Sequence, residues 1–346
     1  MEHEVKTEQP LLDRSGRIVE QGWARHPLWH YDRKAIRGGA LLTKEWEYWA
    51  IVNQKAGYAL TATISDLGYA GLMALSYIDL KRGAVAQRDA IALLPLGRIG
   101  LQAHSRTPSQ VSWANKNVRL AFFNWGSTTR LMVACPSLNL PDGSVGLDFD
   151  LTLTRREDAE SLVIATSWKE RRTAFYYNEK ANCYSASGTI RRGMESETLL
   201  SGEAWGVLDW GRGRWTYQNT WYWASLSTIV ENTTVGLNLG YGFSDRTVAS
   251  ENAIIYDHTI HKLGLVTFHF NHDDLMKRWR ISDEDGRLDL VFDPIVDRSS
   301  VTDMVLIKSV QHQLFGSYSG SLKLDDGTII TLDGAIGFAE EVFNRW

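Results

Sequence analysis

Residues 145–153, Val145-Gly146-Leu147-Asp148-Phe149-Asp150-Leu151-Thr152-Leu153, carry an apolar side chain at every second position. A period of two is typical of an antiparallel strand that packs one face on a core and exposes the other. The same period recurs in residues 47–52, 58–64 and 118–123. Three turn sequences punctuate the chain: Pro141-Asp142-Gly143, Asp285-Gly286 and Asp326-Gly327. The sequence therefore predicts many short antiparallel strands.

Patterns with a helical period are sparse in this chain. We expect one short helix at residues 337–346, with Glu340 and Glu341 in solvent. A long chain with many strands and few helices indicates a β-sandwich or β-barrel, and closed barrels leave no unpaired sheet edges. The fold class predicted is all-β.

The length of 346 residues exceeds that of a usual single core, which favours two domains of similar size. Residues 155–160, Arg155-Arg156-Glu157-Asp158-Ala159-Glu160, form a charged segment between two strand-rich halves. We therefore predict an N-terminal domain at 1–160 and a C-terminal domain at 161–346. The alternative is that this segment is only an exposed hairpin loop.

Composition narrows the class of partner and the compartment. The net charge of −4 is small and Lys and Arg are dispersed, which argues against a nucleic-acid partner. No run of eighteen apolar residues is present, so no membrane-spanning helix is expected. The polar N-terminus lacks the apolar core of a signal peptide, and the two cysteines, Cys135 and Cys183, match no zinc or redox spacing. We predict a cytoplasmic protein and leave its oligomeric state open.

Tryptophan is over-represented, with 14 residues where average usage gives about a third of that number. Residues 208–215, Leu208-Asp209-Trp210-Gly211-Arg212-Gly213-Arg214-Trp215, are followed closely by Trp221-Tyr222-Trp223-Ala224. A charge inside such an apolar run is costly unless it is paired or used. Two readings remain open: a buried Asp–Arg pair that fixes two strands, or a polar centre beneath an aromatic-lined cavity.

Asp209 and Arg212 are the candidate polar centre of that cavity. Asp209 is a candidate general acid if aromatic neighbours favour its neutral form, whereas a nearby guanidinium would keep it ionised. In a regular strand Asp209 and Arg212 point to opposite faces, so pairing them requires a bulge, which Gly211 and Gly213 would permit. The predicted ligand-binding tryptophans are Trp210, Trp215, Trp221 and Trp223.

Two further polar clusters are candidates for the same site. Tyr177 and Lys180 belong to the first, although an exposed Lys with its stem over a barrel is the plainer interpretation. Glu251 and Asn252 lie where a polar segment becomes apolar, and Asn252 could orient a ligand carbonyl or hydroxyl or only stabilise a turn. We predict Asp209, Arg212 and Asn252 as catalytic candidates, with Tyr177, Lys180 and Glu251 as ligand-binding residues.

No cofactor or metal is expected. The pairs His258/His261 and His269/His272 are each three residues apart, a spacing that puts the two side chains of a strand on opposite faces. Neither a glycine-rich phosphate loop nor a dinucleotide fingerprint is present.

Several motifs resemble the domain-of-unknown-function family numbered 2804, over nearly the whole chain. They include Leu11-Leu12-Asp13-Arg14-Ser15-Gly16-Arg17, Gly22-Trp23-Ala24-Arg25, Lys44-Glu45-Trp46-Glu47-Tyr48-Trp49, residues 64–71, 209–224, 251–253 and 261–263, and Gln313-Leu314-Phe315-Gly316-Ser317-Tyr318-Ser319-Gly320. The family name implies no activity.

A more distant resemblance connects the second half to the carotenoid 1,2-hydratase superfamily. It follows Phe175-Tyr176-Tyr177, Ser187-Gly188-Thr189-Ile190, residues 200–205, Asp209 and Trp221-Tyr222-Trp223 in that order. The resemblance implies two lipocalin-like (calycin-type) antiparallel β-barrels with few short helices, and a cavity at or between them. The hydratase pattern has His after Asp, whereas Trp210 follows Asp209 here, which removes the obvious proton partner.

Three interpretations of function follow. The leading one is binding, and transformation by cofactor-free acid–base chemistry, of an apolar or amphipathic small molecule in an aromatic-lined cavity. The second is a carbohydrate-active enzyme that uses Asp209 with Glu251 or Glu203, with tryptophans stacking on a sugar. The third is a non-catalytic binding or scaffold protein.

Overall fold

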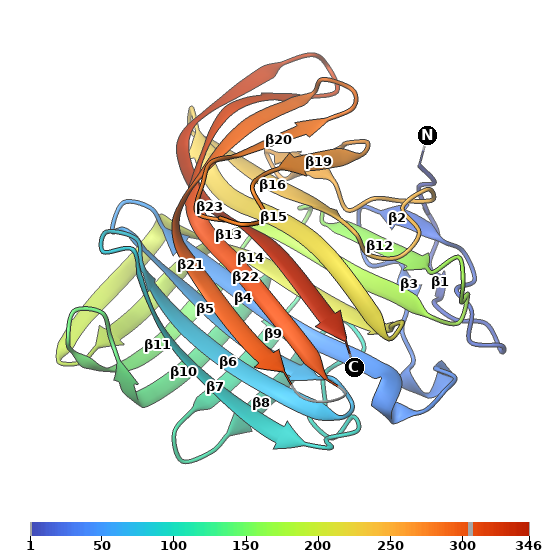
Figure 1. Cartoon of the computed structure of the whole chain (residues 1–346), viewed down its shortest axis with the longest axis horizontal. Coiled ribbons are helices and arrows are strands. Elements are labelled where there is room, and N and C mark those ends of the chain that lie inside the picture. The colour runs from blue at the N-terminus through green and yellow to red at the C-terminus, as the bar shows by residue number, and fades with distance from the viewer. Residues whose placement is uncertain (1, 304–306, 346) are drawn as a thin grey trace.

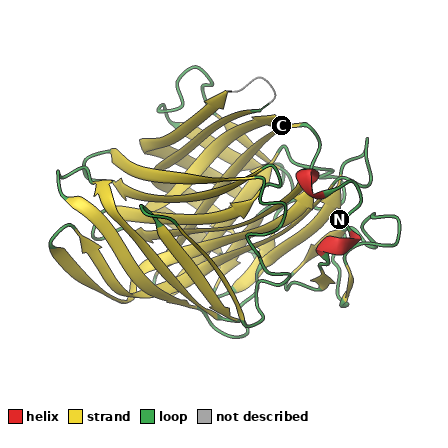
Figure 2. Ribbon diagram, turned by 90° about the horizontal axis from the view of Figure 1, so that it is seen from below, coloured by secondary structure: helices red, strands yellow, loops and turns green. Residues whose placement is uncertain are grey.

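A computed structural model describes residues 2–303 and 307–345 of the chain, which form almost only β-strands. The all-β prediction is confirmed. Two short 3-10 helices accompany the strands, η1 (Arg33–Ala35) and η2 (Ala40–Leu42). In Figure 2 strands make up most of the molecule and are joined by loops, with little helix. Within the described residues, no helix has the length and apolar character needed to cross a membrane.

The larger of two main sheets has twelve strands and takes up the chain from Gly22 to Arg214. Ten strands follow the order β7-β6-β5-β4-β14-β13-β11-β10-β9-β8, and β12 joins β13 to β2. Their bounds are β2 (Gly22–Ala24), β4 (Thr43–Asn53), β5 (Tyr58–Asp66), β6 (Ala70–Asp79), β7 (Ala84–Leu93), β8 (Ser109–Ala114), β9 (Arg119–Trp125), β10 (Thr128–Asn139), β11 (Val145–Thr154), β12 (Leu162–Ser167), β13 (Phe175–Arg192) and β14 (Glu195–Arg214). Two further strands, β1 (Gln9–Pro10) and β3 (Trp29–His30), form a small parallel pair.

The smaller sheet has nine antiparallel strands in the order β18-β17-β16-β15-β23-β22-β21-β20-β19. Their bounds are β15 (Gln218–Val230), β16 (Thr233–Tyr241), β17 (Ala253–Tyr256), β18 (Thr259–Lys262), β19 (Val266–His269), β20 (Trp279–Asp283), β21 (Leu288–Asp303), β22 (Lys308–Lys323) and β23 (Ile329–Arg345). The chain passes from one sheet to the other between Arg214 and Gln218. The predicted division into 1–160 and 161–346 stays a prediction; residue 160 falls between β11 and β12 of the larger sheet.

Each sheet curls around its own apolar core. Hydrogen bonds between strands that are far apart in the order of each sheet show this curling. In the larger sheet Arg88 on β7 donates to the carbonyl of Ser137 on β10, and in the smaller sheet the amide of Phe268 on β19 donates to the hydroxyl of Tyr241 on β16. One apolar cluster fills the interior of the larger sheet and a second fills the interior of the smaller one. The two curled sheets correspond to the two expected barrels, while their likeness to lipocalins stays a prediction.

The outer faces of the two sheets pack against each other, which decides where the site lies. In Figure 1 the orange and red strands β21–β23 cross in front of the blue strands β4–β6. On β4, Trp49 and Ile51 point into the first core, whereas Tyr48, Ala50 and Val52 belong to the cluster between the sheets. Because both faces of β4 and of the second half of β14 are covered, these strands are buried almost throughout.

The helix predicted at residues 337–346 is wrong over the part that is described. Residues up to Arg345 continue β23, which pairs with β15 on one side and β22 on the other. A central strand gains a hydrogen-bonded ladder on both edges, and a short helix here would lose both. Trp346 lies outside the described residues.

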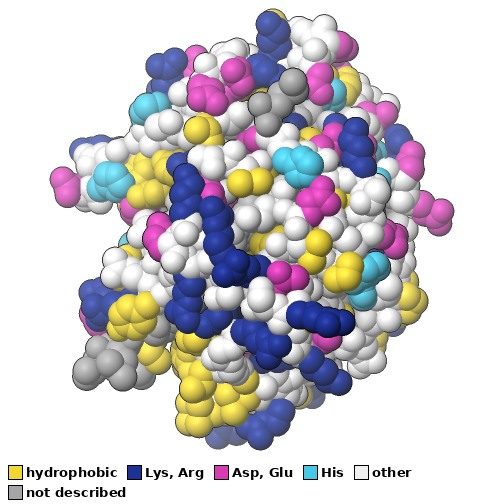
Figure 3. Space-filling model, turned by 90° about the vertical axis from the view of Figure 1, so that its right-hand side faces the viewer, with side chains coloured by type: hydrophobic (Ala, Val, Ile, Leu, Met, Phe, Trp, Pro, Cys, Tyr) yellow, Lys and Arg dark blue, Asp and Glu magenta, His cyan; other side chains and the backbone are white. Residues whose placement is uncertain are grey.

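Figure 3 shows the face at the right-hand side of Figure 1, where several Lys and Arg side chains lie close together beside apolar ones. Asp, Glu and His side chains are dispersed on the same face. The expected absence of a nucleic-acid partner stays a prediction.

Candidate functional site

A cavity of about 330 Å³ lies between the outer faces of the two sheets. Both sheets contribute its walls, so the cavity belongs to neither apolar core. Its floor follows one line of paired residues across each sheet. In the larger sheet Lys180 on β13 pairs with Asp209 on β14, which pairs with Tyr48 on β4.

The facing line runs across the smaller sheet and supplies the other half of the floor. Trp223 on β15 pairs with Glu340 on β23, then Gln313 on β22, then Arg298 on β21. The hydroxyl of Tyr48 donates to Gln313 Oε1 over 3.1 Å and so connects the two lines. Register in two separate ladders therefore brings charged groups from distant parts of the sequence to one place.

Asp209 forms an ion pair with Lys180. Lys180 Nζ lies 2.9 Å from Asp209 Oδ2, and Asn178 Nδ2 donates to Asp209 Oδ1 over 2.6 Å. The ammonium also sits 3.6 Å from the ring centroid of Trp223, within the range of a cation–π contact. With side-chain exposures of 4% for Lys180 and 12% for Asp209, the pair is buried and has three stabilising contacts.

The predicted centre of Asp209 with Arg212 needs correction. No bulge forms, because residues 205–214 of β14 pair with β4 in unbroken register. Strict alternation therefore puts Arg212 on the opposite face from Asp209. There it stacks 3.8 Å from the ring centroid of Trp210 and lies 3.9 Å from Glu45.

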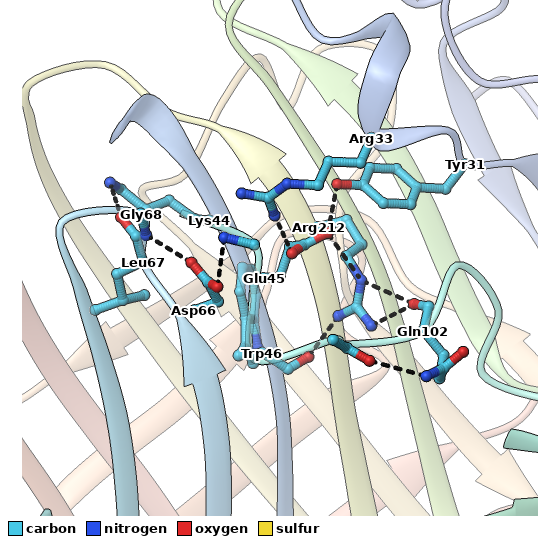
Figure 4. Close-up of polar contacts among 12 residues, drawn as sticks. Tyr31, Arg33, Lys44, Glu45, Trp46, Asp66, Leu67, Gly68, Gln102 and Arg212 are labelled. Carbon is cyan, nitrogen blue, oxygen red and sulfur yellow. Dashed lines mark hydrogen bonds and ion pairs between the residues drawn. The ribbon is translucent and has the colours of Figure 1, made fainter. Parts of the chain in front are cut away.

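Figure 4 shows the polar network around Arg212 and Glu45. Arg212 shares its face of β14 with Trp210 of the first core, so this network lies on the other side of the sheet from the cavity. Arg212 donates to the carbonyls of Gln102 and Trp46, at 2.6 Å and 2.8 Å. Glu45 accepts from the Tyr31 hydroxyl over 2.7 Å and pairs with Arg33. The buried guanidinium is thus satisfied by backbone and carboxylate groups and fixes the chain around β4.

Gly211 allows an aromatic wall to approach this strand closely. A Cβ atom at position 211 would overlap the six-membered ring of the Trp46 indole. The absence of a side chain lets Trp46 lie against the backbone of β14 at the edge of the cavity. Glycine is needed at position 211 for space and not for its backbone conformation, because the φ angle of Gly211 is not positive.

Aromatic side chains form the wall above the floor. Phe243 contacts Trp215 and Trp221 edge-to-face, with centroid distances of 4.6 Å and 5.2 Å. Trp46 contacts Trp215 in the same way at 5.2 Å and stacks on Tyr176 at 6.1 Å. Such pairs hold each ring in place, so the wall is an ordered apolar surface.

Glu251 is a buried carboxyl that lines the cavity near Lys180. The hydroxyl of Tyr176 donates to its Oε2 over 3.3 Å. Burial raises the pKa of Glu251 to about 6, the charge of Lys180 opposes this rise, and the charge of Asp209 adds to it. Glu251 is therefore mainly ionised at neutral pH but is close to its titration range.

Glu340 is the second buried carboxyl of the cavity. Trp221 Nε1 donates to Oε1 over 3.3 Å and Gln313 Nε2 donates to Oε2 over 3.2 Å. Burial raises the pKa of Glu340 to about 7, against the attraction of Lys180 and Arg298. A carboxyl with this pKa is neutral in about half of the molecules near pH 7.

The structure brings together six of the ten predicted site residues in the cavity wall or floor: Lys180, Asp209, Trp215, Trp221, Trp223 and Glu251. Trp210 and Tyr177 instead belong to the core of the larger sheet. The side chain of Asn252 accepts from the Gly240 amide and donates to the Gly264 carbonyl, so it fixes backbone outside the cavity lining.

Several floor and wall residues were not predicted, namely Trp46, Tyr48, Tyr176, Phe243, Arg298, Gln313 and Glu340. The expected C-terminal helix put Glu340 in solvent. If residues 337–346 had been interpreted as a strand, Glu340 would have shared one face with the apolar residues Phe338 and Val342. That face is the buried one, so the pattern would have indicated that Glu340 is buried. Nothing in the local sequence marks Arg298 or Gln313.

Metal-binding side chains do not converge in this structure. Within residues 2–303 and 307–345, no three His, Cys, Asp or Glu side chains are placed so that they could hold a metal ion. Both cysteines are buried and unbonded, and burial raises the pKa of the Cys183 thiol to about 12.

Residues 2–346 match DUF2804, a domain of unknown function. The chain belongs to the DUF2804 family. No curated protein shows significant sequence similarity to this family member.

Solved structures with a similar fold have very different sequences. A protein of Nitrosomonas europaea with a provisional AttH assignment is 12% identical, with a TM-score of 0.47, over 87% of this chain and 92% of its own. CghA, solved with Sch210972, is 10% identical, with a TM-score of 0.48, over 88% of each chain. Kievitone hydratase from Nectria haematococca is 10% identical, with a TM-score of 0.49, over 92% of this chain and 93% of its own. We draw nothing about activity from similarity at this level.

Proposed function

We propose that this DUF2804 protein binds a mainly apolar small molecule in the cavity between its sheets and transfers protons on it with its own side chains. One observation carries the proposal. Two buried carboxyls, Glu251 and Glu340, lie beside the Lys180–Asp209 ion pair beneath an ordered aromatic wall. Titratable groups gathered at an apolar pocket with shifted pKa values are typical of acid–base sites.

Glu340 is the proton donor in this proposal. Its O–H bond breaks, the proton forms a bond to an alkene carbon or carbonyl oxygen of the ligand, and the electron pair stays on the carboxylate. The positive charge that develops on the ligand is balanced by the carboxylate that Glu340 becomes, because Lys180 already pairs with Asp209 and covers the ring of Trp223.

Glu251 is the complementary base, because its pKa of about 6 leaves it mainly ionised when Glu340 is still partly neutral. It accepts a different proton from the ligand and yields an isomer with no net oxidation or reduction. Return of that proton to Glu340 through the ligand or water completes the cycle.

The carbohydrate alternative loses one of its candidate carboxylates. Glu203 is exposed and accepts a hydrogen bond from the Leu200 amide where the pairing of β14 with β13 is irregular, outside the cavity lining. Asp209 with Glu251 remains as a candidate pair, so this alternative stays a prediction.

Deuterium transfer tests the proposal. The protein is incubated in D₂O with a solvent extract of the cells from which it comes, and the small molecules are analysed by mass spectrometry. We expect wild type and Glu341→Gln to add deuterium to the same compound, and Glu340→Gln to lose most of this exchange. Glu341 is the matched control because it faces Tyr222 and His272.

Two results would contradict the proposal. One is that wild type neither retains nor deuterates any compound of the extract. The other is that Glu340→Gln deuterates the compound as fast as wild type. Retention without exchange would support the non-catalytic binding interpretation.

A further inference from the structure

Arg298 lies at one end of the cavity floor, on β21, away from the Lys180 end. Its Nε donates to the Ser76 hydroxyl of the larger sheet over 2.8 Å, and its Nη1 donates to Gln313 Oε1 over 3.0 Å. These bonds hold the guanidinium between the two sheets, where Arg298 lines the cavity.

Among the described residues, Arg298 acts on a buried carboxyl only at a distance, on Glu340 across Gln313. Within the described residues, no carboxylate lies within 4.0 Å of this guanidinium and none of them accepts a hydrogen bond from Nη2. Asp89 lines the same cavity, but it is exposed and accepts from Gln87 over 2.9 Å. Lys180, in contrast, already has Asp209 as its partner.

We infer that Arg298 binds a carboxylate of the cavity's ligand, which makes the ligand class an apolar molecule that bears one acidic group. This inference rests on the proposed function and specifies its substrate. A guanidinium offers planar paired donors that match a carboxylate, and a partly dry aromatic cavity strengthens such a pair. The neighbouring wall groups Ser300, Thr302 and Gln311 are neutral, so Arg298 supplies the positive charge at this end of the cavity.

The position of Arg298 connects binding to the proposed proton donor. Gln313 accepts from Arg298 and donates to Glu340, and the charge of Arg298 is one of those that lower the pKa of Glu340. A carboxylate that neutralises Arg298 removes this effect. An acidic ligand therefore favours the protonated form of Glu340 more than a neutral ligand of the same shape does.

Calorimetric titration with three probes of one chain length tests the inference: decanoate, decan-1-ol and decyltrimethylammonium, at about pH 8, where a free carboxylic acid is ionised. We expect wild type to bind decanoate about tenfold more tightly than decan-1-ol. Arg298→Gln should remove this preference, because it weakens decanoate binding about tenfold more than decan-1-ol binding. Arg298→Lys should retain part of it, and the exposed Arg280→Gln should behave as wild type.

The ratio of decanoate to decan-1-ol affinity is read on the same protein sample, so partial misfolding of a variant affects both probes alike. An equal ratio in wild type and Arg298→Gln overturns the inference while the proposed function stands. Tighter binding of decyltrimethylammonium also overturns it, because the acidic floor would then select the ligand. If no probe binds wild type, the proposed function itself fails.

Discussion

Single residues at the cavity floor carry charges that their surroundings only partly compensate. Lys180 and Asp209 neutralise each other, whereas Glu340 has two hydrogen-bond donors but no cation in direct contact. Burying a carboxylate under these conditions costs free energy, and the raised pKa of Glu340 expresses that cost. Such a group makes the stability of the protein depend on pH.

Replacing Glu340 by Gln should therefore change how stability depends on pH. The folded-state pKa of about 7 lies above the ordinary value of 4.5, so the stabilising effect of the bound proton is complete below pH 4.5 and is lost as pH rises through 7. Relative to its value at about pH 4, the free energy of unfolding of Glu340→Gln should exceed that of wild type by up to about 3 kcal/mol at about pH 8.

Urea unfolding of both proteins at several pH values measures this difference. All other titratable groups are the same in the two proteins, so their contributions to the difference largely cancel. Glu341→Gln is the control and should follow wild type. A difference that does not vary with pH would contradict the account.

Asp209→Asn should destabilise the protein by about 3–5 kcal/mol, because it leaves the buried Lys180 ammonium without its carboxylate. Adding Lys180→Met should recover much of the loss, which a double-mutant cycle in urea would show. The exposed pair of Arg130 and Asp150 supplies the control, since Asp150→Asn should cost less than about 1 kcal/mol. A cost for Asp209→Asn as small as that of the control would show that the two side chains do not pair.

At the scale of strands, the central elements differ from ordinary half-exposed strands because both of their faces are covered. β14 presents Leu208 and Trp210 to the first core and Val207 and Asp209 to the space between the sheets. Successive side chains of such a strand therefore lie alternately in two different environments. Its sequence consequently shows charges embedded in an apolar run, and each charge must be assigned to the correct face.

Gly211→Ala tests how closely β4 and β14 must approach at the cavity edge. The new methyl group overlaps the Trp46 ring, and overpacking of this kind typically costs about 1–3 kcal/mol. Trp46→Phe removes the overlapping part of the ring, so the double variant should be less destabilised than the sum of the single ones. Thermal or urea unfolding of the four proteins gives the coupling. Simple additivity would mean that the clash lies elsewhere.

At the scale of the whole molecule, alternation was enough to predict the all-β class and the strands around residues 47–52, 58–64, 118–123 and 145–153. It also predicted that Asp209 and Arg212 need a bulge to meet, and the regular register keeps them apart. The actual partner of Asp209 depends on the pairing of β13 with β14, which local sequence does not reveal.

Other parts of the site could not be predicted because they arise from sheet-on-sheet packing. Arg298 and Ser76 are 222 residues apart in sequence and meet only because two sheets stack. Glu340 was assigned to solvent because a short charged segment at the end of a chain resembles a helix end. Its place in a central strand follows from two neighbours, β15 and β22, that the local pattern does not show.

The central claim is that the space between the sheets is the ligand site. Thr63 lines this cavity from β5, whereas Thr331 is exposed on β23 outside it. Calorimetric titration with decan-1-ol should give similar dissociation constants for wild type and Thr331→Trp, and binding at least about tenfold weaker for Thr63→Trp, whose indole fills the cavity. Equal affinity of Thr63→Trp and wild type would contradict the claim.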